Sequence, residues 1–136
     1  MRLDLLVNDF VYRAFKDGFL VLFEPNFKRN YIHIRDVCEV FTYSLNNFSK
    51  MKNQIYNVGL SDANLSKKEL CEIISEYLPL VYYENNFKED PDKRNYIVSN
   101  SKLENTGFNA KFSIRDGIKE LIKLYTGINL SSFRNI

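Results

Sequence analysis

Arg29 is the residue in this 136-residue chain whose type and position best suit the chemistry of a binding site. It lies at the end of a polar loop, residues 24–30, directly before a short apolar run. A guanidinium group at such a place can donate its planar set of hydrogen bonds to the oxygens of a phosphate or diphosphate. A surface arginine, paired with Glu24 or with nothing, is the alternative, and composition alone favours that alternative.

The other groups that could do chemistry are expected to have structural roles. His33, the single histidine, stands between two isoleucines, and this setting indicates a hydrogen-bonded core residue rather than a catalytic acid or a metal ligand. Cys38 and Cys71 have neither CxxC spacing nor a histidine that could complete a metal site, so buried, reduced thiols are expected. The acidic residues of 89–92 belong to a polar stretch and are expected to be solvated.

Composition and charge exclude several classes of protein. Apolar residues make up 45% of the chain and aromatic residues 15%, which is enough for a buried core and argues against disorder. The net charge of +2 is small and its cations are dispersed, so no nucleic-acid-binding surface is indicated. No apolar run approaches the ~20 residues of a membrane span, and Asp4 and Asp9 interrupt the N-terminal apolar stretch, unlike a secretory signal. We therefore expect a cytoplasmic protein without a membrane span.

Apolar residues at helical spacing, together with capping residues, predict the helices that must position these groups. One helix ends at Gly18, one is opened by Asp36, one follows an S-x-x-E capping box, one covers residues 101–106, and the last runs from Ser113 to Gly127. The apolar face of the second helix is expected to contain five residues: Val37, Val40, Phe41, Leu45 and Phe48. Met1 stands almost at the first helical turn, which we interpret as a sign of truncation.

Short extended runs alternate with the helices and predict an α/β class. They cover residues 19–23, 31–34, 55–58, 80–83 and 96–98. These strands are too few and too short for an independent doubly wound sheet. We expect them to complete a sheet that begins elsewhere.

Four motifs in this order resemble the C-terminal third of extended short-chain dehydrogenase/reductases, the nucleotide-sugar 4-epimerases, dehydratases and reductases. They are VNDFV (7–11), RNYIHIRDV (29–37), YNVG (56–59), and Arg94 followed by Ser101-Lys102-Leu103 and Gly107-Phe108. The resemblance covers residues 1–125. It implies an incomplete C-terminal portion of a Rossmann-type enzyme: a substrate-binding part over 1–127, a tail over 128–136, and no N-terminal dinucleotide-binding part.

The resemblance also implies roles for five residues. Arg29 and Arg94 match the arginines that contact the nucleotide diphosphate, and Asn8 matches an asparagine near the substrate phosphates, with solvent or a local backbone bond as its alternative. Val21 and Phe23 match positions that line the base pocket, with ordinary strand packing as their alternative. The sequence departs from the family near Arg94, because the aspartates that follow this arginine in the family are absent.

The family's cofactor turn and catalytic pair are missing. The five glycines are scattered and cannot form G-x-x-G-x-x-G, the turn that places a pyrophosphate at a helix N-terminus. Tyr-x-x-x-Lys has one formal match, Tyr12 and Lys16, which we expect on a solvated helix face. NAD(P) is thus implied for the full-length family but is not expected to bind this chain alone.

The leading hypothesis is the nucleotide-sugar-binding part of an NAD(P)-dependent epimerase (an isomerase), dehydratase or reductase, inactive without its N-terminal half. Its expected partners are a nucleotide sugar and either that half or a homo-oligomer. The alternative is a non-catalytic module that binds a sugar nucleotide or docks on a full-length relative. Nucleic-acid binding has little support from the charge.

Overall fold

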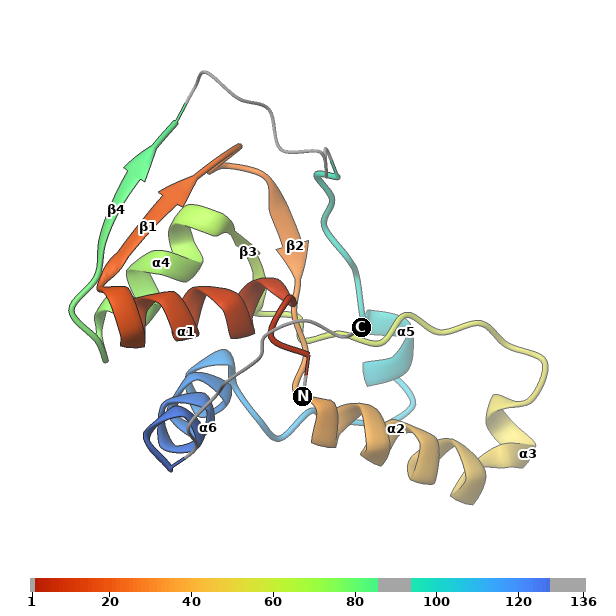
Figure 1. Cartoon of the computed structure of the whole chain (residues 1–136). Coiled ribbons are helices and arrows are strands. Elements are labelled where there is room, and N and C mark those ends of the chain that lie inside the picture. Colours follow the sequence, from red (N-terminus) through yellow and green to blue (C-terminus); the bar gives the residue numbers. More distant parts are fainter. Residues whose placement is uncertain (1, 86–93, 128–136) are drawn as a thin grey trace.

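Helices and short strands alternate along the chain, of which the computed structural model describes residues 2–85 and 94–127 (Figure 1). Ten elements follow in this order: α1 (Leu6–Asp17), β1 (Phe19–Leu22), β2 (Lys28–Asn30), α2 (Ile34–Asn46), α3 (Phe48–Met51), β3 (Asn64–Ser66), α4 (Lys67–Ser75), β4 (Val81–Glu84), α5 (Ser101–Glu104) and α6 (Ile114–Gly127). The predicted α/β class with a few short strands is confirmed. The acidic residues of 89–92 and the tail 128–136 lie outside the described residues.

The strands form two separate pairs. β1 and β4 are parallel, with Phe19 opposite Val81, and β2 and β3 are antiparallel, with Arg29 opposite Leu65. A two-stranded sheet has little stability of its own, so each pair depends on the helices that cover it.

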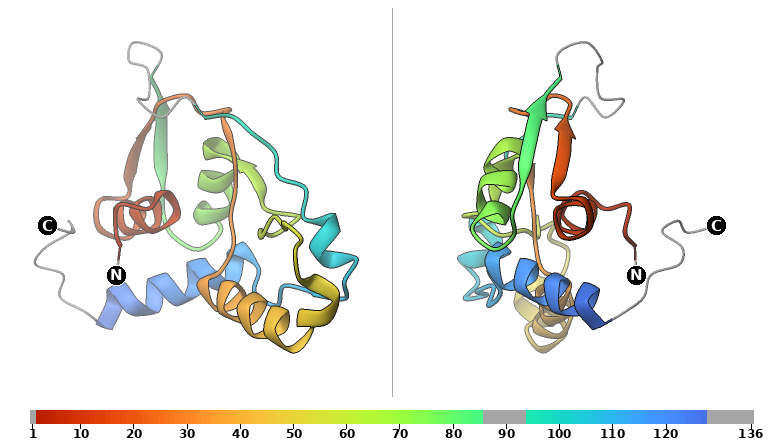
Figure 2. Two further views of the ribbon diagram at one scale, coloured as in Figure 1. Left: turned by 90° about the vertical axis from the view of Figure 1, so that its right-hand side faces the viewer. Right: turned by 60° about the vertical axis from the view of Figure 1, so that its left-hand side comes forward.

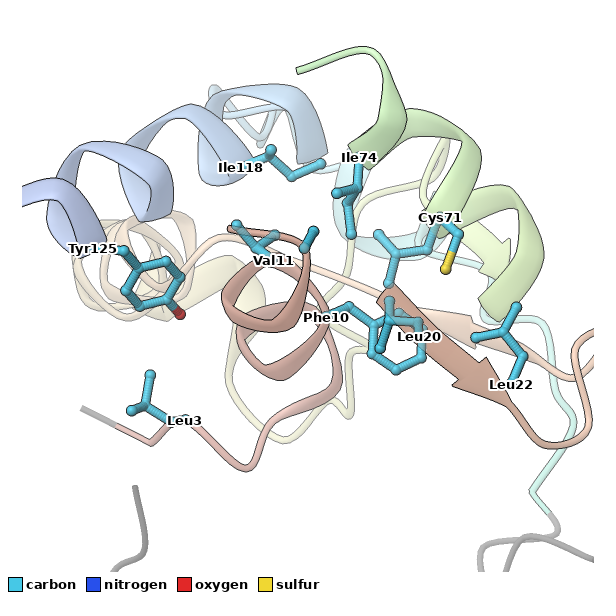
Figure 3. Packing of buried hydrophobic residues seen from close by; sticks show 11 residues of the cluster. Leu3, Phe10, Val11, Leu20, Leu22, Cys71, Ile74, Ile118 and Tyr125 are labelled. Atoms are coloured by element: carbon cyan, nitrogen blue, oxygen red, sulfur yellow. The ribbon is translucent and has the colours of Figure 1, made fainter. Parts of the chain in front are cut away.

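The main core lies where α1, α4 and α6 converge on the inner face of β1 (Figure 3). Val11, Ile74 and Ile118 meet there from the three helices, and Leu20 and Leu22 come from the strand. Two helix boundaries are as predicted: Gly18, at φ 65°, closes α1, and the capping box of Ser66 and Glu69 opens α4. Both signals are local, which is why the sequence revealed them.

The two cysteines differ from each other. Cys71 is fully buried in the main core, and this burial raises the pKa of its thiol to about 12, so the predicted inert, buried thiol is confirmed there. Cys38 is exposed on α2, so the prediction of burial was wrong for it.

Three of the predicted extended runs are not strands, and one of them, residues 96–98, is extended but unpaired with any described strand. Residues 31–33 have no strand partner, and Ile34 already belongs to α2. The strand lies directly before them, at β2, because β3 pairs with Lys28–Asn30. Residues 55–58 are also unpaired, and no other described strand lies beside them. An apolar run with strand-like composition forms a strand only where a neighbouring strand pairs with its backbone N–H and C=O groups.

The helix α2 is covered on one side only. Val40 faces a small cluster with Met51, Leu103 and Phe108. Phe41 and Leu45 are 70% and 74% exposed, so the predicted apolar face is real in sequence but largely uncovered in the structure. In Figures 1 and 2, α2 and α3 lie at the end of the molecule away from the β1–β4 pair.

Among the described residues, no helix is both long enough and apolar enough to cross a membrane.

Candidate functional site

A cavity of about 1040 Å³ opens between the start of α1, the segment from β2 to the start of α2, and α6. Three of the five residues predicted for the site line it: Asn8, Arg29 and Arg94. Val21 and Phe23 do not line it; Val21 is half-exposed on β1, where it stands opposite Tyr83. The fold thus brings together residues that are up to 86 positions apart in the sequence.

Arg29 is buried at the cavity wall, with 8% of its surface exposed. Its Nη1 donates to the carbonyl oxygen of Lys28 at 2.9 Å, and its guanidinium carbon lies 5.5 Å from the ring centroid of Tyr96. The ring face attracts the cation and limits its rotation. A buried guanidinium held in one orientation is suited to an anion that presents several oxygens.

Arg94 reaches the same cavity because the segment after it runs along β2. The backbone N–H of Lys28 donates to the Asn95 side chain at 2.9 Å, and the N–H of Tyr96 donates to the Lys28 carbonyl at 3.3 Å. Further on, the Asn64 side chain exchanges two hydrogen bonds with the backbone of Val98, at 2.9 and 3.0 Å. The side-chain amides of Asn64 and Asn95 therefore hold residues 95–98 against β2 and β3, and the sequence predicts an extended run at 96–98.

Lys67 is a cavity residue that the sequence did not reveal. It is 4% exposed, it lines the cavity, and its Nζ donates to the carbonyl oxygen of Phe23 at 2.6 Å. In the sequence it is one lysine of a first helical turn, which usually faces solvent. The β2–β3 register, which sets Ser66 opposite Lys28, brings Lys67 to the cavity that Arg29 also lines. Lys67 is thus a second buried cation, beside Arg29, among the residues that line the cavity.

Asn8 combines a cavity position with a local bond. Its side-chain N–H donates to the backbone carbonyl of Arg2 at 2.7 Å, and its backbone carbonyl accepts from the Tyr125 hydroxyl at 3.0 Å. Burial, and secondly the charge of Asp9, raise the pKa of Tyr125 to about 12, so the phenol remains a donor. This bond fixes α1 against α6 and holds the cavity wall formed by both.

His33 and Asp36 have structural contacts, in different roles from those predicted. His33, not Asp36, caps α2: its Nδ1 accepts from the Arg35 N–H at 3.2 Å, and its Nε2 lies 3.3 Å from Glu120. Asp36 is fully buried, and its carboxylate accepts from the N–H groups of Lys111 and Phe112, at 2.9 and 3.1 Å. A buried carboxylate needs such donors, and it ties the approach of α6 to α2.

Tyr12 and Lys16 lie outside the cavity lining. The Tyr12 ring packs at right angles to Tyr125, with centroids 5.3 Å apart, so the expectation of a solvated Tyr12 was wrong. Lys16 places its Nζ 5.7 Å from the centroid of the Tyr12 ring. Tyr12 thus belongs to the α1–α6 contact, whereas Lys16 is exposed, as predicted.

The described residues do not fit a dinucleotide. The order at Gly18 is helix, glycine, strand, which is the reverse of the strand–turn–helix that receives a pyrophosphate. Gly117 and Gly127 belong to α6. Gly59 of YNVG is required by packing instead, since a Cβ there would stand 1.7 Å from Asn30 Oδ1 and 2.9 Å from Asn100 Oδ1. No cluster of metal-ligating side chains occurs in residues 2–85 and 94–127.

Solved structures of similar fold are sugar-nucleotide enzymes. GDP-mannoheptose C4 reductase from Campylobacter jejuni, with NADP bound, matches 90% of this chain at a TM-score of 0.72 and 20% identity. A GDP-6-OMe-4-keto-L-xylo-heptose reductase from C. jejuni matches 82% at 0.66 and 21% identity, and UDP-glucose 4-epimerase from Thermotoga maritima, with UDP-glucose, matches 90% at 0.64 and 20% identity.

This chain spans only 45%, 34% and 40% of the lengths of those three proteins. No protein-family model matches the chain. The structural likeness confirms, at the level of the fold, the resemblance of the sequence motifs to the C-terminal part of the extended short-chain dehydrogenase/reductases that act on nucleotide sugars.

Proposed function

We propose that the cavity binds a nucleoside-diphosphate sugar, with Arg29, Lys67 and Arg94 at the diphosphate and Asn8 beside it. The observation that carries this proposal is the convergence of two buried cations, Arg29 and Lys67, on one cavity. Its volume of about 1040 Å³ is that of a site for a sizeable small molecule. Both side chains can donate charge-assisted hydrogen bonds to phosphate oxygens, and such bonds are stronger than neutral ones.

The chain would then hold and orient the nucleotide sugar in an NAD(P)-dependent epimerase, dehydratase or reductase. A bound nicotinamide supplies or accepts hydride in such enzymes, and the described residues do not fit that cofactor. We therefore propose that a second polypeptide part carries the dinucleotide site and the proton-transferring tyrosine, and that this chain is inactive without it. The proposed substrate-binding part covers residues 1–127.

Thermal unfolding with UDP-, GDP-, CDP- and dTDP-sugars tests the binding proposal. A ligand at 100 times its dissociation constant adds about 2.7 kcal/mol to the free energy of unfolding. We expect a stabilising shift with at least one of the four, its loss in Arg29→Ala, and an affinity reduced about tenfold or more in Lys67→Met, since each removes a charge-assisted bond. No shift with any nucleotide sugar would contradict the proposal.

Lys68→Met is the matched control. Lys68 is the neighbour of Lys67 in sequence, but its Nζ pairs with Glu84 at 2.9 Å and it does not line the cavity. Its ligand shift should equal that of the wild type. Because Lys67 also holds the Phe23 carbonyl, each variant's shift is measured against its own unliganded midpoint.

A non-catalytic sugar-nucleotide-binding module is the second candidate, favoured by the misfit between the described residues and a dinucleotide. Both candidates predict the same ligand shift. They separate when the chain is mixed with a dinucleotide-binding part and NADPH: turnover of a nucleotide sugar supports the enzyme, and binding without turnover supports the module.

A further inference from the structure

Tyr96 is the most exposed of the three Tyr and Phe residues in the described lining of the cavity. It is 40% exposed, whereas Tyr31 and Phe112 are half-buried. The Phe112 ring is already covered. The His33 ring stacks on it, with centroids 4.7 Å apart, and the Arg35 guanidinium carbon lies 5.4 Å from its centroid. Of these three rings, Tyr96 therefore offers the most surface to a ligand in the cavity.

The Tyr96 ring is held in a fixed relation to Arg29. The carbonyl oxygen of Lys28 accepts from the Arg29 Nη1 at 2.9 Å and from the Tyr96 N–H at 3.3 Å. The Arg29 guanidinium carbon lies 5.5 Å from the Tyr96 ring centroid, and the Asn95 side chain accepts from the Lys28 N–H at 2.9 Å. A ring held in this way loses little freedom when a ligand covers it, so the contact costs little conformational entropy.

We propose that Tyr96 stacks on the nucleobase of the nucleoside-diphosphate sugar and thereby selects nucleotides over other diphosphates. This inference rests on the proposed function, which assigns the diphosphate to Arg29. Because the Tyr96 ring adjoins that guanidinium, a group joined to the diphosphate lies within its reach. Of the two such groups, the sugar has to reach the second polypeptide part, and the nucleoside is left to this chain. An aromatic side chain can stack on the π-face of any base.

Tyr96 supplies a base contact that the sequence motifs do not imply. Val21 and Phe23, which the resemblance implies for the base pocket, do not line the cavity, and the Phe23 carbonyl accepts from the Lys67 Nζ at 2.6 Å. The stretch after Arg94 is also where the sequence departs from the family, because the aspartates are absent there. Tyr96 lies in this stretch, so the stacking contact belongs to this chain's own sequence.

Calorimetric titration with UDP, GDP, CDP and dTDP, and with inorganic pyrophosphate, separates a base contact from an indirect effect through Arg29. Pyrophosphate offers phosphate oxygens without a base. In Tyr96→Leu we expect the affinity for the tightest-binding nucleoside diphosphate to fall about tenfold, and that for pyrophosphate to stay within about twofold. Tyr96→Phe keeps the ring and should bind both as the wild type does. Proton NMR gives a second readout, since the ring current should move the base protons of the bound nucleotide upfield in the wild type and in Tyr96→Phe, but not in Tyr96→Leu.

Tyr83→Leu is the matched control, because Tyr83 is an exposed tyrosine, at 63%, that lies on β4 outside the cavity lining. It should bind every ligand as the wild type does. Equal losses for nucleotide and pyrophosphate in Tyr96→Leu, or an unchanged nucleotide affinity, would overturn the inference and leave the proposed site intact. A wild type that binds none of the four nucleoside diphosphates would contradict the proposed function, and this inference with it.

Discussion

The region around α1, β1, α4 and α6 is closed, whereas the region of α2, α3 and 55–58 is open. In the closed region, helices cover the inner face of β1 and large side chains such as Ile74 and Ile118 are fully buried. In the open region, four buried residues form a small cluster, and the larger apolar side chains face outward. Both regions have amphipathic helices of similar sequence character. The comparison shows that apolar spacing predicts which face of a helix should be buried. Whether another element covers that face depends on the rest of the fold.

The largest effect should come from a matched pair of leucine truncations, Leu70→Ala in α4 and Leu45→Ala in α2. Leu70 is fully buried, so its truncation should cost about 2–5 kcal/mol through lost burial and the cavity left behind. Leu45 is 74% exposed, and its truncation should change stability by less than about 0.5 kcal/mol. Urea unfolding of both variants measures this, and similar losses would remove the contrast between the two regions.

Asp36 connects the regions, because its buried carboxylate on α2 accepts from the backbone that leads into α6. Asp36→Ala removes the acceptor of the Lys111 and Phe112 N–H groups and should cost about 2–3 kcal/mol. Asp36→Asn keeps one acceptor oxygen and should cost less. Chemical denaturation orders the three proteins, and an Ala variant as stable as the wild type would show that the two regions are not joined there.

A smaller effect is expected at the N-terminus of α4, within the closed region. Ser66 accepts from the Glu69 N–H at 3.1 Å, and Ser66→Ala should cost about 1 kcal/mol. Because Lys67 follows directly, fraying of this turn should also weaken the nucleotide-sugar shift. Ser44→Ala, on the half-buried side of α2, is the comparison that should leave that shift unchanged.

The smallest effect is a pH dependence of the same cap. Hydrogen bonds from the Ser66 backbone N–H, and secondly from its side chain, hold the pKa of Glu69 below its ordinary value. A carboxyl whose pKa is lowered on folding contributes stability above its unfolded-state pKa, and this contribution is lost as the pH falls through the folded-state pKa. Melting between pH 7 and pH 3 should therefore show a shallower loss in Glu69→Gln than in the wild type. Equal slopes would mean that this carboxylate does not stabilise α4.

Much of the site and fold could be predicted from local patterns. The spacing of Arg29 after a polar loop, read with the motifs around it, identified a residue that lines the cavity. Lys67 could not be found in this way, because nothing in a first helical turn distinguishes a buried lysine from a solvated one. The pairing of β2 with β3 sets its position, and that pairing joins residues more than 30 positions apart.

The sequence by itself determined the helices α1, α4 and α6, since their apolar spacing and their caps are properties of neighbouring residues. Only the tertiary structure decided which apolar faces are covered, that 55–58 remains unpaired, and that His33 rather than Asp36 caps α2. Burial and strand pairing depend on segments that are distant in the chain, and for α2 and 55–58 none of the described segments supplies them. In the open region, the described residues leave an apolar helix face uncovered and an extended segment unpaired.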